Sequence, residues 1–168
     1  MTSSAPHVQD RPATPFVGTT TGVSRATFAE IADLIPELVG ALISRGTTPA
    51  GAPFFRYLEI AGESMTVQVG VPVPRGATLP EHVTPFPTEA GELPAGRYIA
   101  TTHVGPFDGL AGATEQLLAW AGDQRLDLDR EVVDGIEKWA ARLEIYLTDP
   151  RLETDPRHFR TELAIKLR

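Results

Sequence analysis

The chain repeats one order of secondary-structure signals, and this repeat limits its fold more than any other feature. From about residue 13 to residue 73 the chain has a β-rich segment, then a helical segment, then two segments that are typical of strands. The same order returns over residues 95–168. The triplet Leu-Glu-Ile at residues 58–60 recurs at residues 143–145, each time in the strand after a helix. Two such modules can pair edge to edge, with both helices on one face. We therefore expect one α+β domain over residues 1–168, built from two strand-helix-strand-strand modules related by a pseudo-twofold axis.

The first module gives the clearest periodicity. Residues 27–46 carry apolar residues at three- and four-residue steps between a Thr-x-x-Glu capping pattern and a glycine, which predicts a helix. Pro36 lacks a backbone donor, so we expect a short first turn, a break, and the main helix from about Ile35. Residues 54–60 predict a strand. Residues 65–73 alternate strictly, which predicts a half-buried antiparallel strand.

The segment between the modules is rich in proline, with six prolines in residues 72–96. Proline donates no backbone hydrogen bond, so we expect a linker at residues 74–94 that holds only loops and short edge strands. In the second module the spacing predicts strands over 98–104, 142–148 and 161–167 and a helix over 110–121. Asp129, with Leu128 and Val133 as a hydrophobic staple, predicts a short third helix.

Composition excludes several classes of function. The 168 residues include no cysteine, which excludes disulfides, cysteine zinc sites and cysteine nucleophiles. With 22 acidic against 15 basic residues and no basic stripe, we expect no direct contact with nucleic acid. The four histidines are isolated in sequence, so we expect no metal, and no motif implies a cofactor. No apolar run approaches the roughly 18 residues of a membrane span and no signal-peptide pattern occurs, so we expect a soluble, cytoplasmic protein without membrane contact.

Glu144 is the strongest candidate for chemistry. Side chains alternate along its strand, so Glu144 shares a face with Tyr146, while Leu143 and Ile145 share the face that we expect to meet the helices. Trp139 lies shortly before it. A carboxylate among aromatic rings can hold a lipophilic cation, or can become a general acid or base when burial raises its pKa. A solvated glutamate on an exposed sheet face is the simpler alternative.

The first module offers a matching set of residues. By the same alternation Phe55, Tyr57 and Glu59 share a face, so Glu59 either approaches the groove from the symmetric side or is simply exposed. Trp120 lies on the flank of the second helix, and Phe107 lies just before that helix. The ligand-binding candidates are Glu144, Tyr146, Trp139, Tyr57, Phe55, Trp120, Phe107 and Glu59. If the protein is an enzyme, the catalytic candidates are Glu144 and Tyr146.

Five motifs, in order, resemble the GyrI-like effector-binding family. They are GAPFFRY at 51–57, GVPV at 70–73, LPAGRY at 93–98, HVGPFDGL at 103–110 and LEIYLTDP at 143–150. Their order and spacing fit the family from about residue 12 to residue 168. The resemblance implies a curved antiparallel sheet with a ligand groove between the helices. It also implies that Glu144 is the glutamate at the bottom of an aromatic pocket.

Members of this family are sensor domains of multidrug-responsive transcription regulators, stand-alone antagonists of DNA gyrase, or hydrolases of cyclopropane-bearing genotoxins. Residues 1–15 are too short for a helix-turn-helix, so we expect a stand-alone protein. The resemblance favours binding of hydrophobic, often cationic aromatic compounds in a groove with Glu144 at its floor, for drug sensing, sequestration or resistance. Two alternatives stay open: a hydrolase that uses Glu144 and pocket aromatics, and an inhibitor of the gyrase-antagonist kind, whose protein partner the sequence does not identify.

Overall fold

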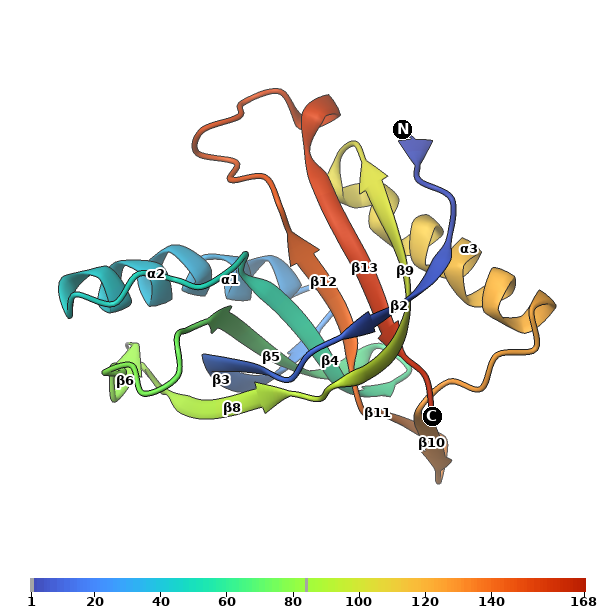
Figure 1. Ribbon diagram of the computed structural model, residues 1–168, viewed down its shortest axis with the longest axis horizontal. Coiled ribbons are helices and arrows are strands. Elements are labelled where there is room, and N and C mark those ends of the chain that lie inside the picture. The colour runs from blue at the N-terminus through green and yellow to red at the C-terminus, as the bar shows by residue number, and fades with distance from the viewer. Residues whose placement is uncertain (1, 84) are drawn as a thin grey trace.

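The computed structural model describes residues 2–83 and 85–168, which form an α+β fold (Figure 1). The principal strands are, module by module, β3 (Thr14–Ser24), β4 (Phe54–Ala61) and β5 (Ser64–Pro72), then β9 (Gly96–Val104), β12 (Arg142–Tyr146) and β13 (Arg160–Lys166). They form one antiparallel sheet in the order β9-β13-β12-β4-β5-β3. From the central β12–β4 pair, β13 and then β9 follow on one side, and β5 and then β3 follow on the other. Each strand of one module thus has a counterpart at the same distance from the centre in the other module. The duplicated module and the pseudo-twofold axis are therefore confirmed.

Each module contributes one main helix. The helical segments are α1 (Phe28–Ala32) and α2 (Leu34–Ser44) in the first module and the 3-10 turn η1 (Phe107–Gly109) and α3 (Leu110–Asp123) in the second. The predicted break is confirmed and falls at Asp33, and Gly46 ends the helical region with φ of 75°. The capping box does not form, because the Thr27 hydroxyl accepts from the Ser24 amide at 3.0 Å instead of capping α1. No helix of the described residues is long and apolar enough to span a membrane.

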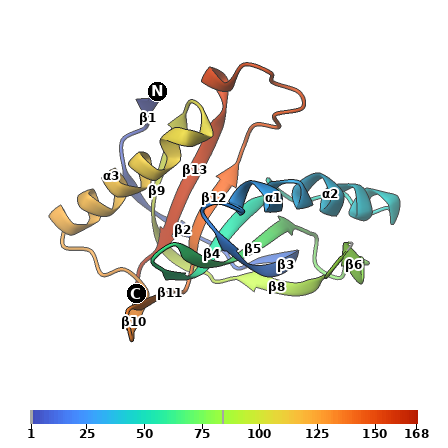
Figure 2. The ribbon, with the colours of Figure 1, turned by 180° about the vertical axis from the view of Figure 1, so that it is seen from behind.

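The register across the sheet shows which face the helices cover. Glu144 pairs with Phe55 on one side and with Leu163 on the other, so these three side chains share a face. Leu38 of α2 packs in one cluster with Phe55, and Leu117 of α3 packs in another with Leu163. Both main helices therefore cover the face that carries Glu144, and Figure 2 shows β12 and β13 between them.

The opposite face of the sheet is buried as well, which corrects one prediction. Leu143 and Ile145 do not meet the helices; they pack with Phe16 of β3 and Tyr98 of β9. The sheet curves (Figure 1), and the aromatic side chains of its outer strands belong to one packed cluster with the central strand β12. For the same reason β5 is buried on both faces from residue 67 to residue 72 instead of being half-buried. Alternation alone does not tell two buried faces apart.

Short strands extend the sheet at both edges. They are β1 (Thr2–Ser3) and β2 (His7–Arg11), which pair with β9, and β8 (Glu89–Leu93), which pairs with β3. Two further short strands, β6 (His82–Val83) and β7 (Phe86–Pro87), pair with each other. The proline-rich linker thus forms short edge strands, as predicted, while the N-terminal pairing was not predicted.

The predicted third helix is wrong. The segment forms a hairpin of β10 (Arg130–Val133) and β11 (Ile136–Trp139), and β11 pairs with β4. Its two-residue turn consists of Asp134 and Gly135, with φ of 53° and 77°. Two consecutive residues with positive φ make the turn that joins twisted antiparallel strands. The Asp-Gly pair is the sequence signal for this hairpin.

Candidate ligand-binding site

Glu144 lies at the centre of a polar cluster on the helix-covered face. The Tyr57 hydroxyl donates to its Oε1 at 2.9 Å, and the Tyr146 hydroxyl donates to its Oε2 at 2.6 Å. Tyr146 is two residues further along β12, and Tyr57 is two residues beyond Phe55, the cross-strand partner of Glu144. Each carboxylate oxygen thus accepts a short, charge-assisted hydrogen bond, one from each module.

Burial controls the ionisation of this cluster. Burial raises the pKa of Glu144, and the hydrogen bonds from Tyr146 and Tyr57 and the charge of Arg142 oppose that rise only in part. Burial and the neighbouring carboxylate raise the pKa of both tyrosines, so their hydroxyls stay protonated and act as donors. The result is a largely buried carboxylate that is more basic than a solvated one.

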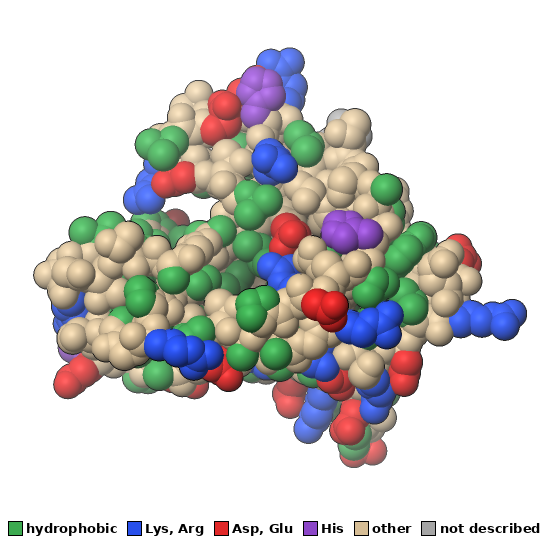
Figure 3. Space-filling model, in the orientation of Figure 1, with side chains coloured by type: hydrophobic (Ala, Val, Ile, Leu, Met, Phe, Trp, Pro, Cys, Tyr) green, Lys and Arg blue, Asp and Glu red, His purple; other side chains and the backbone are tan. Residues whose placement is uncertain are grey.

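A continuous row of aromatic rings borders the carboxylate. The centroid separations are 6.1 Å for Phe28–Tyr57, 5.3 Å for Phe28–Phe55, 5.2 Å for Phe55–Tyr146, 5.7 Å for Tyr146–Phe107 and 5.0 Å for Phe107–Phe159. The row crosses both modules, from Phe28 of α1 to Phe107 of η1 and on to Phe159, and Phe107 is 42% exposed. Phe159 follows the loop that joins β12 to β13, and Figure 3 shows the surface indented between this loop and the lobe of α1 and α2. Such rings offer apolar area and π faces to a ligand.

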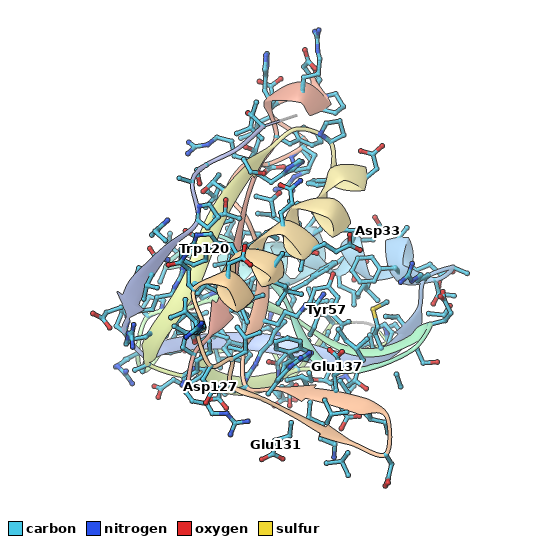
Figure 4. The ribbon with its side chains drawn as sticks, turned by 90° about the vertical axis from the view of Figure 1, so that its right-hand side faces the viewer. Asp33, Tyr57, Trp120, Asp127, Glu131 and Glu137 are labelled. Carbon is cyan, nitrogen blue, oxygen red and sulfur yellow. The ribbon has the colours of Figure 1, made fainter. Side chains whose placement is uncertain are left out.

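A small cavity lies against Glu144, and we call it the Glu144 pocket. Its lining residues are Tyr57, Thr114, Arg142, Leu143, Glu144, Leu163 and Ile165, from β4, α3, β12 and β13. Figure 4 shows Tyr57 beside α3. The pocket has a volume of about 10 Å³, which is room for about one water molecule. Sites for drug-sized ligands measure about 300 Å³ or more, so a larger ligand must displace side chains.

The structure brings together most of the residues that the sequence singled out. Phe55, Tyr57, Tyr146 and Phe107 all belong to the ring row beside Glu144. Trp139 is buried and does not itself line the pocket, but Arg142 does, and its guanidinium carbon lies 5.1 Å from the centre of the Trp139 indole. Its Nε1 donates to Glu137 Oε2 at 3.0 Å.

Two predicted residues lie elsewhere. A β-bulge separates Tyr57 from Glu59, and beyond it Ile60, not Glu59, packs on the helix-side clusters. The Glu59 carboxylate lies 3.6 Å from Lys138 Nζ and lines a separate cavity of about 440 Å³ near the ends of β3, β4 and β5. Trp120 packs at the edge of the cluster beneath α3, and Figure 4 shows it away from Tyr57.

Four residues of the site were not predicted from the sequence. Phe28 and Phe159 extend the ring row, Thr114 of α3 lines the pocket, and Arg142 brings a second charge to it. For Arg142 the signal was its place two residues before Glu144 on an alternating strand. Phe28 and Thr114 lie on helices packed against the sheet from distant sequence positions, and only the fold brings them close. Within residues 2–83 and 85–168, no group of three acidic or histidine side chains is arranged to hold a metal ion.

Comparisons with solved structures agree with this fold. The C-terminal domain of EcmrR superposes with a TM-score of 0.72 at 18% identity, covering 98% of this chain and 97% of that one. The chain spans 57% of the EcmrR chain in its complex with DNA. SAV2435 bound to tetraphenylphosphonium gives a TM-score of 0.66 at 10% identity, covering 98% of this chain and 94% of that one. A hydrolase from Listeria innocua gives 0.61 at 13% identity, covering 97% and 91%.

These identities are low, so the likeness establishes the shared fold alone. No curated protein matches the chain. The sequence model of the GyrI-like small molecule binding domain, however, matches residues 4–168, nearly the whole chain. That match includes the six principal strands, both main helices and the motifs from GAPFFRY to LEIYLTDP. The chain therefore belongs to the GyrI-like small-molecule-binding domain family.

Proposed function

We propose that residues 1–168 act as one domain that binds hydrophobic aromatic small molecules, cationic ones included, at the Glu144 pocket. The observation that supports this most is a carboxylate held by two tyrosine hydroxyls inside a row of aromatic rings. Each oxygen of Glu144 has a further lone pair, which can accept from a donor on the ligand or attract a positive charge. The rings of Phe55 and Tyr146 supply apolar contact beside that anchor.

The ring contacts indicate how a ligand would reach the Glu144 carboxylate. Phe28 stacks on Tyr57 with an angle of 6° between the ring planes, so it occupies the position that a planar aromatic ligand would take. Phe28 belongs to α1, a helix of five residues that ends at the break near Asp33. A ligand that displaces Phe28 would replace one ring stack by another. Such binding would serve drug sensing, sequestration or resistance in the cytoplasm, and neither nucleic acid nor membrane contact is part of the proposal.

A separate observation favours a second function, hydrolysis of an electrophile such as a cyclopropane-bearing genotoxin. The Glu144 pocket has room for about one water molecule between Glu144 and Thr114. Because burial raises its pKa, Glu144 is a stronger base toward water than a solvated glutamate. Glu144 would take a proton from the water while the water oxygen bonds to a cyclopropane carbon and the ring C–C bond at that carbon breaks. The carbon released by that cleavage would take the electron pair of the broken bond and then the proton from Glu144, and Tyr146 would hold the carboxylate in place.

Titration of the purified protein with lipophilic aromatic compounds tests the binding function. Trp139 adjoins the pocket through Arg142, and Trp120 does not. The variant Trp120→Phe keeps Trp139, so its emission should change at saturation. The variant Trp139→Phe keeps Trp120, so its emission should not change. If calorimetry shows binding but the emission of Trp120→Phe stays constant, the ligand binds elsewhere.

Mass spectrometry of the same mixtures separates the two functions. A binding protein returns the compound unchanged, whereas a hydrolase returns a product heavier by one water. The test set includes cyclopropane-bearing genotoxins, because they are the electrophiles proposed above. Unchanged genotoxins in the presence of folded protein would reject the hydrolase and leave binding in place.

A further inference from the structure

Arg142 brings a positive charge into the Glu144 pocket. It precedes Glu144 by two residues on β12, so its side chain leaves the strand on the same face. Its guanidinium carbon lies 5.1 Å from the centre of the Trp139 ring and 5.5 Å from that of Tyr57. Both distances fall within the range of cation–π contact. A cation of the protein itself thus already occupies the aromatic surroundings of the pocket.

The guanidinium makes no hydrogen bond and no ion pair in the part of the chain that the structure describes. Its neighbours there are the two rings and, at longer range, the charges of Glu137 and Glu144. Arg56, on the neighbouring strand, differs, because it donates to Ala140 O at 2.6 Å and to Gln68 Oε1 at 3.3 Å. If Arg142 served only to balance Glu144, a direct ion pair would be the expected arrangement. Instead the carboxylate oxygens bond to two tyrosines, and the donors of Arg142 stay free for a ligand.

We propose that Arg142 sets the charge preference of the pocket: it weakens binding of cationic aromatic ligands and strengthens binding of anionic ones. This inference rests on the binding function proposed above. Glu144 attracts a cation, and Arg142 repels it from the same wall of the pocket. In partly buried surroundings, a unit charge about 7 Å from a ligand charge changes affinity by about tenfold or more.

Tetraphenylphosphonium and tetraphenylborate make a suitable pair of probes, because they have nearly the same size and shape and opposite charges. Calorimetry with Arg142→Met should show phosphonium binding about tenfold tighter and borate binding about tenfold weaker than with the wild type. Arg130→Met is the matched control. Arg130 also lies over the Trp139 ring, at 5.2 Å, but it belongs to the β10–β11 hairpin and pairs with Glu137 at 3.5 Å. Its removal should change each affinity by less than about threefold.

A second background keeps the test valid if Arg142→Met alone does not fold. Glu144→Gln combined with Arg142→Met leaves neither charge in the pocket, so no unbalanced buried charge opposes folding. Comparison of this double variant with Glu144→Gln alone gives the effect of Arg142 directly. The ratio of the two dissociation constants should shift in the same direction as in the wild-type background.

The outcomes separate the two proposals. If neither probe binds the wild-type protein, the proposed function fails and the inference fails with it. Suppose that both probes bind and that Glu144→Gln weakens phosphonium binding. If the removal of Arg142 then leaves the ratio within about threefold in both backgrounds, the binding function stands and the role of Arg142 is overturned.

Discussion

The two modules carry the same Leu-Glu-Ile triplet, but their glutamates have different surroundings. Glu144 receives hydroxyl hydrogen bonds at 2.9 Å and 2.6 Å and lies beside a row of rings. The Glu59 side chain is 44% exposed, and its nearest charged neighbour is Lys138 at 3.6 Å. The bulge between Tyr57 and Glu59 accounts for the difference, because one extra residue moves the helix-facing position to Ile60. A duplicated fold has thus produced one carboxylate site instead of two.

The contrast also shows what makes a carboxylate useful as an anchor. Water and salt screen the Glu59–Lys138 pair, which is exposed on both sides. The charge of Glu144 is less screened, and its two oxygens are fixed in position by hydroxyl groups before any ligand arrives. A ligand therefore meets a preorganised acceptor at Glu144 and a mobile surface ion pair at Glu59.

The largest expected effect concerns packing around the two glutamates. Phe55 is 2% exposed and contacts the rings of Phe28 and Tyr146, so Phe55→Ala should lower the free energy of unfolding by about 3–5 kcal/mol. Met65 lines the open cavity beside Glu59, so Met65→Ala should cost about 1 kcal/mol. Urea denaturation measures both. Similar losses would show that the two regions are packed alike and would remove this part of the contrast.

The next effect concerns the hydrogen bond from Tyr146. Tyr146→Phe leaves Glu144 Oε2 without its donor, which should cost about 1–3 kcal/mol of stability and raise the pKa of Glu144 further. Tyr98→Phe is the control, because the Tyr98 hydroxyl donates to Pro94 O at 2.6 Å and is not bonded to Glu144. Carbon-13 NMR of the glutamate carboxyl groups reports the pKa. An unchanged Glu144 titration in Tyr146→Phe would mean that the bond does not hold the carboxylate.

The pH dependence of stability tests the burial of Glu144. Its folded-state pKa is raised, so the folded protein binds more protons than the unfolded chain between the two pKa values. The contribution of Glu144 to the free energy of unfolding therefore falls as pH rises through that interval. Urea denaturation from about pH 4 to about pH 8 should show wild type losing stability relative to Glu144→Gln. A difference that is constant, or that changes in the opposite direction, would contradict a buried carboxylate.

The smallest expected effect concerns the surface ion pair. Lys138→Ala removes the partner of Glu59 and should change the free energy of unfolding by about 0.5 kcal/mol or less. The change should shrink as salt is added, because salt screens exposed charges. A loss well above that value, insensitive to salt, would mean that Glu59 is more firmly held than its exposure indicates.

Much of the fold could be predicted because it depends on local periodicity. Spacing alone predicts the repeated element order, the break before Pro36 and the strands that precede and follow each main helix along the chain. The face toward the helices could not be predicted, because the sheet curves and both of its faces are covered: Leu143 is buried on one face, and the helices pack on the other. The Asp-Gly pair at residues 134 and 135 is a turn signal for the hairpin, but the capping pattern at Asp129 received more weight and led to the prediction of a helix.

The candidate site was predictable where side chains follow regular alternation. Glu144 and Tyr146 share a strand face, and alternation placed Tyr57 and Phe55 on one face of the neighbouring strand. Glu59 departs from this pattern because a bulge depends on pairing between strands and leaves no mark in the alternation of one strand. Contacts across the sheet, such as that of Phe28 with Tyr57, depend on helix packing and needed the fold itself.

Binding of tetraphenylphosphonium to Glu144→Gln and Glu59→Gln, measured side by side by calorimetry, tests whether Glu144 anchors the ligand. Both variants replace one carboxylate by an amide of the same shape, so the overall change in charge is equal. We expect Glu144→Gln to weaken binding by about 1–3 kcal/mol, on the scale of a charge-assisted contact, while Glu59→Gln leaves it unchanged. Equal losses in the two variants, or unchanged binding by a folded Glu144→Gln, would contradict the assignment of Glu144 as the anchor of the site.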